Sequence, residues 1–202
     1  EGLFNDEIVN VEIPQRKGDP KLFSVDEGVR VESTYDSLSG LRPAFDKAGN
    51  ITAGNASQIS DGGAAVIVAS EAAAERLGIT PLGRIVGYGQ VAGPDASLLD
   101  QPANAINSAL DRVGMKVSDL DLFELNEAFA AVGVASMAKL GITDEITNVN
   151  GGAIALGHPI GMSGTRVALH LLLELKRRGG GKGAAALCGG GGQGDAILLE
   201  TI

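Results

Sequence analysis

The sequence predicts an α/β fold in which helices cover a mixed, mainly parallel sheet. Between residues 81 and 202, short apolar runs typical of strands alternate with longer stretches of helical periodicity. A polar or reactive side chain follows several of these runs, as expected where the carboxyl ends of strands line a site. Because 44% of the 202 residues are hydrophobic, the chain has ample material for a buried core. These observations favour a sheet packed between helices.

The first part of the chain, to about Ile51, lacks sustained helical periodicity. A strand is expected from Ile8 to Ile13, followed by charged, irregular sequence such as QRKGDPK. From Asp61 the pattern changes to alternation, with an apolar run from Ala64 to Ala69 and a helix from Glu71 to Leu77. We therefore expect a surface excursion before the α/β domain begins.

Strands and helices then alternate through the rest of the sequence. The expected strands cover residues 84–91, 122–125, 184–187 and 196–199, with a short extended segment at 146–149. The expected helices cover residues 103–113, 127–140 and 163–178. This order is typical of layered α/β proteins.

Composition excludes several classes of function. The formal net charge of −9 and the pI of about 4.7 leave no broad basic surface for nucleic acid. No apolar stretch approaches the roughly 20 residues of a membrane span, and the first residues resemble neither a signal nor a transit peptide. The single cysteine, Cys188, excludes an intrachain disulfide and a multi-cysteine metal site. We expect a cytoplasmic protein that binds neither nucleic acid nor membranes.

Three candidate functional side chains, Asn126, His158 and Cys188, follow predicted extended segments. Each has a structural alternative: Asn126 could cap the following helix, His158 could be a turn residue before Pro159, and Cys188 could be a small buried side chain. Glycines crowd around them, and small residues let backbone N–H groups approach a ligand or a developing oxyanion. Together the three residues indicate a catalytic site.

Two other features carry less weight. The string CGGGGQGD contains G-x-G-x-x-G, but only eight residues follow Gly194, which leaves no room for the βαβ unit of a dinucleotide site. The second histidine, His170, lies in a helical pattern without an evident polar constellation, which favours a packing or surface role. Two histidines far apart in sequence do not make a metal site, so we expect none.

Four blocks of sequence resemble the thiolase family, in that family's order. They are TAGNASQISDGGAA (52–65), NEAFA (126–130), NVNGGAIALGHPIGMSGTR (148–166) and CGGGGQG (188–194). The resemblance implies the thiolase fold, with two similar βαβαβαββ halves and an inserted loop domain. On this basis residues 1–58 are the remainder of the loop domain, residues 59–80 are the last elements of the N-terminal half, and residues 81–202 are the C-terminal domain.

The resemblance also implies roles for individual residues. His158 resembles the histidine that activates a nucleophilic cysteine and donates to the thioester oxygen, and Asn126 resembles the asparagine that holds a water in that oxyanion site. Cys188 resembles the second cysteine, an acid/base, and the N–H of Gly190 matches an oxyanion donor. A thiol needs local help to reach the thiolate state at neutral pH, which we expect from the glycine-rich N–H groups.

Three further positions match the family's coenzyme A site. Ser57 and Phe129 resemble residues that line the pantetheine tunnel, and Arg30 more weakly matches a loop-domain residue near the adenine end. Coenzyme A thioesters are substrates in this family, so no cofactor is expected. The resemblance implies partners of two kinds: acetyl-CoA, acetoacetyl-CoA and CoA as ligands, and a homo-oligomer, dimeric or tetrameric, once the N-terminal half is present.

The expected function is that of an acyl-CoA C-acyltransferase, acetyl-CoA C-acetyltransferase, in fatty acid metabolism. It condenses two acetyl-CoA to acetoacetyl-CoA and CoA, or runs the reverse thiolysis. The family's nucleophilic cysteine lies in the N-terminal half, so the resemblance implies a fragment, a processed chain or one half of a split enzyme. The alternatives are a degradative 3-ketoacyl-CoA thiolase of longer chain length and a non-catalytic assembly half.

Overall fold

A computed structural model of the chain describes residues 2–202. The elements before the main sheet are β1 (Val11–Ile13), β2 (Lys21–Phe23), α1 (Tyr35–Ser39) and α2 (Glu71–Leu77). The main-sheet strands are β3 (Gly83–Ala92), β4 (Leu122–Leu125), β5 (Lys182–Gly189) and β6 (Gln193–Thr201). The remaining helices are α3 (Gln101–Val113), η1 (Val117–Asp119), α4 (Ala130–Leu140), η2 (Asp144–Ile146), α5 (Ala153–Leu156) and α6 (Ser163–Arg177).

The four-stranded main sheet is mixed, with the strand order β3-β6-β5-β4. The α/β class and the mixed sheet are confirmed, but the expectation that the sheet is mainly parallel is wrong. Of its pairings, β4 with β5 is parallel, whereas β3 with β6 and β5 with β6 are antiparallel. The reason is the short glycine turn between β5 and β6, because strands joined by so few residues can pair only antiparallel.

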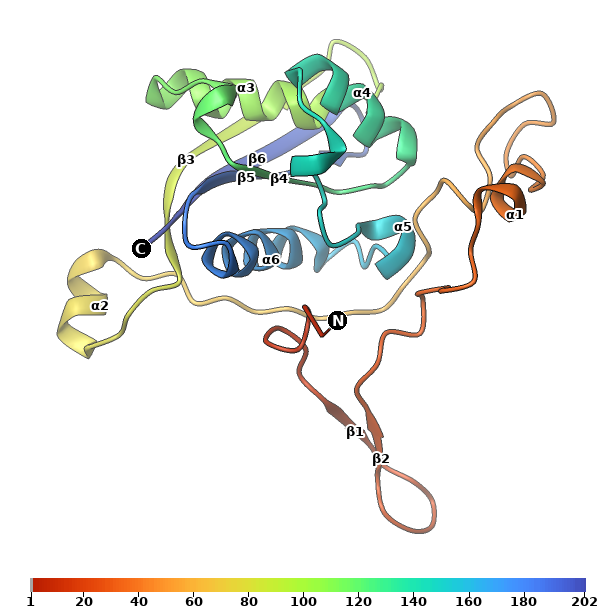
Figure 1. Cartoon of the computed structure of the whole chain (residues 1–202), viewed down its shortest axis with the longest axis horizontal. Coiled ribbons are helices and arrows are strands. Elements are labelled where there is room, and N and C mark those ends of the chain that lie inside the picture. The colour runs from red at the N-terminus through yellow and green to blue at the C-terminus, as the bar shows by residue number, and fades with distance from the viewer. Residues whose placement is uncertain (1) are drawn as a thin grey trace.

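Helices cover both faces of this sheet (Figure 1). The face toward α3 and α4 buries one cluster, which includes Ile106, Phe123 and Leu198. The opposite face packs on α6 and buries a second cluster, which includes Leu122 and Leu171. Leu122 and Phe123 are neighbours in β4 on opposite faces, as the two-residue period of a strand requires. The core therefore lies within residues 81–202.

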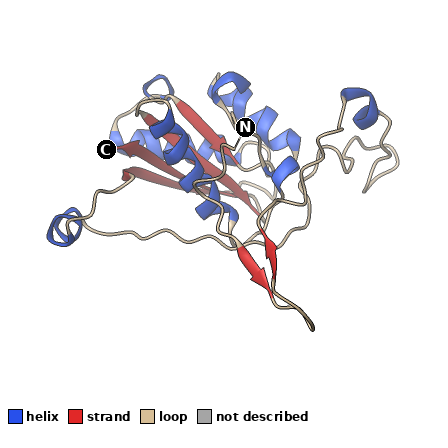
Figure 2. Cartoon of the chain, turned by 60° about the horizontal axis from the view of Figure 1, so that its bottom comes forward, coloured by secondary structure: helices blue, strands red, loops and turns tan. Residues whose placement is uncertain are grey.

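The segment before the sheet is extended and exposed (Figures 1 and 2). The β1–β2 hairpin projects away from the main body, and a long extended stretch passes below α6 toward α2. Among residues 2–80, Ala74 is the single buried residue. Separately, none of the helices described is both long and apolar enough to cross a membrane.

Most of the predicted elements are present, four segments differ from the expected pattern, and the short elements β2, α1, η1, η2 and α5 were not predicted. The strand expected at residues 8–13 is reduced to β1, and the apolar run 64–69 is extended without a strand partner among residues 2–202. Residues 146–149 form the end of η2 and one parallel bridge, from Thr147 to Phe123. The helix expected from residue 127 begins at Ala130. In each of these four segments, the presence or lack of a tertiary contact determined which residues form the helix or strand.

His170 has a polar environment that the sequence did not reveal. Its side chain is fully buried on α6, where its ring stacks on Phe4. The Nδ1 atom lies 2.5 Å from Glu7 Oε1, and Nε2 lies 3.1 Å from Asn150 Nδ2. Because Asn150 Nδ2 can only donate, Nε2 accepts and Nδ1 carries the proton toward Glu7. The packing role is confirmed, but the expected lack of polar neighbours is wrong.

Candidate active site

Asn126 is held at the end of β4 with its side chain toward His158. It is fully buried, and its backbone N–H donates to the C=O of Ala186 on the adjacent strand β5 at 2.9 Å. Its side-chain Nδ2 lies 3.3 Å from His158 Nε2. The helix after it begins at Ala130 with Phe129 in the N-cap position, so Asn126 is not the helix cap. The alternative of a purely structural cap is thereby excluded.

His158 has a defined protonation pattern. Its Nδ1 lies 2.6 Å from Ser163 Oγ, and that hydroxyl donates its one proton to the C=O of Pro159 at 3.0 Å. Ser163 must therefore accept from Nδ1–H, which leaves the Nε2 lone pair facing Asn126 Nδ2. Partial burial, together with the positive charge of Arg166, lowers the pKa of His158 below its ordinary value. The ring is thus a neutral imidazole at physiological pH, and its unprotonated nitrogen is Nε2, which accepts from Asn126 Nδ2.

Cys188 lies within β5, two residues beyond the Ala186 carbonyl that binds Asn126. It is half-buried and pairs in register with Gly194 of β6. Burial raises the pKa of the Cys188 thiol, and a backbone hydrogen bond acts in the opposite direction. Because burial is the larger cause, the expected net help toward the thiolate is not found. The resting group is a thiol.

Gly190 lies in the turn between β5 and β6, directly after the strand that carries Cys188. A Cβ at this position would meet nothing within 4 Å, so the backbone of Gly190 borders open space. Gly192, in the same turn, has φ +77, and a Cβ there would lie 1.8 Å from the backbone oxygen of Asp95. The turn therefore requires glycine at residue 192 for a steric reason and leaves Gly190 unobstructed.

Comparison with known proteins identifies the family. Family models match twice: that of the thiolase C-terminal domain over residues 79–201, and that of the thiolase N-terminal domain over residues 1–72. The chain belongs to the thiolase family. It is 60% identical over 201 residues to a probable acetyl-CoA acetyltransferase of Mycobacterium tuberculosis, an alignment that covers 100% of this chain and 51% of that protein.

Solved thiolase structures have the same fold. The acetyl-CoA acetyltransferase of Bacillus anthracis superimposes with a TM-score of 0.95 at 45% identity, over 100% of this chain and 51% of that one. Human mitochondrial 3-ketoacyl-CoA thiolase in complex with CoA gives 0.91 at 45% identity, over 100% and 50%. This thiolase chain spans about half the length of the curated relatives it matches. The division at residues 58 and 80 stays a prediction.

Two of the three proposed coenzyme A residues of this thiolase lie side by side. The N–H and the hydroxyl of Ser57 both donate to the C=O of Ala128 at 3.1 Å, and Ala56 forms a bridge with Phe129. The Phe129 ring in turn meets Phe45 edge-on at 6.4 Å. These contacts hold the loop before residue 58 against the segment that follows Asn126. Ser57 and Phe129 are therefore joined to the catalytic candidates.

Arg30 lies apart from that pair. It is exposed, and its C=O accepts from the N–H of Ser33 at 3.2 Å within its own loop. The nearest attachment of this loop to the site is through Gln58, whose Nε2 donates to the C=O of Gly28 at 3.0 Å. The role of Arg30 near adenine stays a prediction.

The family motifs also contain supporting residues that sequence reasoning missed. Glu127 accepts from Asn148 Nδ2 at 2.7 Å and from the N–H of Ile154 at 3.1 Å. Asn148, at φ 47, also brackets the backbone of Leu125, with Oδ1 accepting from its N–H and Nδ2 donating to its C=O. These bonds fix the glycine-rich loop that carries His158. Glu127 follows Asn126 directly, which is the one signal that could have indicated this role.

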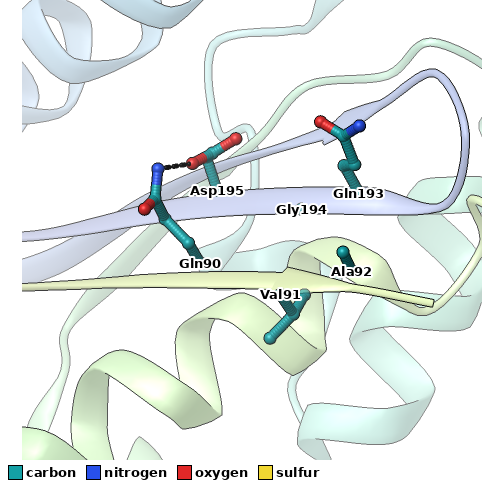
Figure 3. Close-up of a pocket in the computed structure, with 6 residues that line it drawn as sticks. All are labelled: Gln90, Val91, Ala92, Gln193, Gly194 and Asp195. Atoms are coloured by element: carbon teal, nitrogen blue, oxygen red, sulfur yellow. Dashed lines mark hydrogen bonds between the residues drawn. The ribbon is translucent and has the colours of Figure 1, made fainter. Parts of the chain in front are cut away.

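A pocket of about 330 Å³ lies at the end of β3 and the start of β6 (Figure 3). Gln90 and Asp195 line it and share a hydrogen bond of 2.7 Å across the two strands. None of the candidate catalytic or coenzyme A residues lines it, so it is separate from the site above. Among residues 2–202, no group of three or more His, Cys, Asp and Glu side chains is arranged to hold a metal ion.

Proposed function

We propose that this chain supplies the acid/base and oxyanion groups of a thiolase-type acyl-CoA C-acyltransferase that condenses two acetyl-CoA to acetoacetyl-CoA and CoA. One observation carries the proposal: Asn126 and His158 meet at 3.3 Å beside the strand that bears Cys188. The names of two similar proteins support acetyl-CoA as substrate: a probable acetyl-CoA acetyltransferase of Mycobacterium tuberculosis and the acetyl-CoA acetyltransferase of Bacillus anthracis. The acyl acceptor is a nucleophilic cysteine on the N-terminal half.

In the acylation step, His158 acts as the base. Its unprotonated Nε2 takes the proton of the nucleophilic cysteine, whose sulfur attacks the thioester carbonyl of the first acetyl-CoA. The N–H of Gly190, together with the N–H of the nucleophilic cysteine itself, stabilises the oxyanion of this step, and Nε2–H with the water held by Asn126 stabilises the thioester oxygen of the second acetyl-CoA. Because its pKa is raised, Cys188 starts as a thiol and gives its proton to the departing CoA sulfur. The products of this step are an acyl-cysteine, free CoA and the Cys188 thiolate.

In the condensation step, Cys188 acts as the base. The thiolate removes a proton from the methyl carbon of the second acetyl-CoA, and the enolate carbon attacks the acyl-cysteine carbonyl. The carbon–sulfur bond breaks, and His158 returns its proton to the leaving cysteine sulfur. Cys188 is again a thiol and the nucleophilic cysteine has its proton back, so the proton transfers balance over the cycle. The same groups run thiolysis in reverse.

A second candidate is a 3-ketoacyl-CoA thiolase that cleaves longer chains. Human mitochondrial 3-ketoacyl-CoA thiolase, solved with CoA, matches this chain at a TM-score of 0.91, which favours CoA thioesters without fixing the acyl length. Rates with acetoacetyl-CoA and with a longer 3-ketoacyl-CoA would distinguish the two. A higher kcat/KM for the longer substrate would favour the second candidate.

The remaining parts of the proposal concern the setting of the reaction. The chain works with the N-terminal half of the thiolase, as a cytoplasmic homo-oligomer in fatty acid metabolism. The reaction requires no cofactor and no metal, because sulfur and imidazole groups supply both proton transfers. Neither nucleic acid nor a membrane takes part, in keeping with the net charge of −9.

Single-turnover labelling with acetyl-CoA tests these roles in the enzyme assembled from both halves. Cys188→Ser replaces the thiol with a hydroxyl of far higher pKa, so condensation should fall on the order of a hundredfold or more while acyl transfer persists in part. His158→Ala removes the base for acylation and an oxyanion donor, so labelling should fall by a similar factor.

The comparison between these two variants decides the assignment. If Cys188→Ser abolishes labelling as fully as His158→Ala does, or still condenses at the normal rate, Cys188 is not the carbon acid/base. If the assembled wild-type enzyme neither condenses acetyl-CoA nor cleaves any 3-ketoacyl-CoA, the proposed activity itself is refuted, and the assembly-half alternative gains support.

A further inference from the structure

A group of buried polar atoms beside the site has no hydrogen-bond partner within residues 2–202. It comprises Nε, Nη1 and Nη2 of Arg166, Oε2 of Glu124 and Oδ1 of Asn126. A buried donor or acceptor without a partner costs about 1–3 kcal/mol, more if it is charged. Five unpaired polar atoms on these three residues indicate that a bound molecule bridges them. Both donors and acceptors are present, so the set can satisfy itself through a small bridging molecule.

The three residues lie on, or directly after, two elements that pack on each other, β4 and α6. Glu124 and Asn126 are two residues apart at the end of β4, so their side chains leave the strand on the same face. Arg166 on α6 faces Glu124, with Nη1 4.0 Å from Glu124 Oε2. That distance is too long for a direct hydrogen bond but suits a bridge through water. A water held there would have the two to four polar partners that buried waters require.

The orientation of the Asn126 amide gives this arrangement a consequence for catalysis. Asn126 presents Nδ2 to His158, so its Oδ1 points away from the histidine and needs a donor. Glu124, whose pKa is about 7, has no donor once it is ionised, whereas the guanidinium of Arg166 has donors only and at every pH. The positive charge of Arg166 also opposes protonation of His158, whose other side-chain contacts are Ser163 and Asn126.

We propose that Arg166 is a positioning residue: through water shared with Glu124 and Asn126, it fixes the Asn126 amide in the orientation that presents Nδ2 to His158. Arg166 does not touch the reacting atoms and acts through Asn126 and the histidine. The consequence for turnover rests on the proposed function. The hydrogen-bond network itself does not, because it can be measured without any substrate.

NMR of the ¹⁵N-labelled 202-residue chain tests the network directly. The chain has two histidines, so two sets of imidazole signals appear, and the variant His170→Gln assigns them. In the wild type, His158 should be the Nδ1–H tautomer, and the Asn126 side-chain amide should be protected from hydrogen exchange. Arg166→Gln removes the charge and most donors, so the pKa of His158 should move upward and the Asn126 protection should be lost.

Two further variants separate charge from hydrogen bonding. Arg166→Lys keeps the charge but loses the planar fork, so the pKa of His158 should stay low while Asn126 protection falls. Arg84→Gln removes an exposed arginine paired with Glu200 at the far edge of the sheet and should change neither signal. If Asn126 protection is unchanged in both Arg166 variants, with circular dichroism as in the wild type, the proposal is refuted.

A crystal structure and kinetics of the enzyme assembled from both halves complete the test. The crystal structure should show water within hydrogen-bond distance of both Arg166 and Asn126 Oδ1, and a direct side-chain partner from the N-terminal half in its place would overturn the proposal. Arg166→Lys should lower kcat by on the order of tenfold while KM for acetyl-CoA changes little. An inactive wild-type enzyme would refute the proposed function and leave the NMR result standing.

Discussion

Similar apolar side chains are exposed in residues 2–80 and buried in residues 81–202. In the second region Phe123 is 1% exposed, and the sheet around it is covered by helices on both faces. In the first region Ile67 is 97% exposed and Val68 73%, although the run from residue 64 to 69 is as apolar as any strand of the sheet. Hydropathy alone therefore does not decide burial in this chain.

The difference between the regions is the presence of a second layer. The gain from burying apolar surface is proportional to the area removed from water, and a strand loses that area only when a sheet or helix packs on it. Between residues 81 and 202 every strand has a pairing partner and a covering helix. The extended segment before α2 has neither within the part of the chain described. Its apolar side chains form a surface that another layer could cover.

The largest expected effect is a difference in stability between matched core and surface substitutions. Phe123→Ala should lower the free energy of unfolding by about 3–5 kcal/mol, because it leaves a cavity in the cluster beneath α3. Ile67→Ala should change it by less than about 0.5 kcal/mol, since the side chain is almost fully exposed. Urea unfolding followed by circular dichroism measures both. An equal loss for Ile67→Ala would show that this segment is buried in solution.

Glu124 is an exception to the contrast between an apolar buried region and an exposed one, because it is a carboxyl group buried inside residues 81–202. Burial raises its pKa from the ordinary 4.5 to about 7, against the opposing charge of Arg166. The folded state thus binds the proton more tightly than the unfolded state. Stability due to this group is full below pH 4.5, falls as pH rises to about 7 and stays low above that.

Replacing Glu124 tests whether its contribution to stability falls as pH rises. Glu124→Gln imitates the protonated carboxyl at every pH, so at pH 8 the variant should be more stable than the wild type by up to about 3 kcal/mol. Near pH 4.5 the two proteins should be nearly equal. Thermal unfolding between pH 4.5 and 8 makes the measurement, and Glu12→Gln on the exposed β1 strand controls for the loss of one carboxylate. A parallel pH profile for wild type and Glu124→Gln would contradict the burial argument.

The smallest effect separates two glycines of similar backbone conformation, one in each region. Gly18 has φ +84 with nothing within 4 Å of an added Cβ, so Gly18→Ala should cost no more than about 1–2 kcal/mol. Gly192 has φ +77, and its Cβ would collide with the Asp95 backbone, so Gly192→Ala should cost a further 1–3 kcal/mol or so. Chemical denaturation of both variants gives the difference. Equal effects would mean that the turn relaxes freely.

Much of the secondary structure was predictable because its signals are local. The helix α2 and the strand β4 have the predicted bounds, since a serine cap, a glycine C-cap and a compact apolar run define them in sequence. The late start of α4 was not predictable, because residues before Ala130 are held in place by contacts with Ala186 and with Ser57, far away in the chain. The direction of strand pairing was also misjudged for lack of any local signal.

For the site, the motifs indicated which residues to examine, and the fold showed how they meet. Asn126 and His158 were predicted to converge, and their side chains are 3.3 Å apart. Ser163 and Arg166 lie inside the same motif but drew no attention, because a serine or arginine at a helix start has ordinary explanations. Their relation to the histidine depends on how α6 packs against β4, which sequence spacing does not report.

The sequence by itself determined the thiolase family, the order of strands and helices, and the side chains available for acid/base chemistry, since these follow from residue types and short-range periodicity. The tertiary structure decided the protonated nitrogen of His158, the thiol state of Cys188 and the environment of Glu124. The proton position on His158 depends on Ser163, five residues away, and on Asn126, 32 residues away, whereas the states of Cys188 and Glu124 depend on burial. Electrostatic and hydrogen-bond energies depend on distance in space, and only the folded chain fixes those distances.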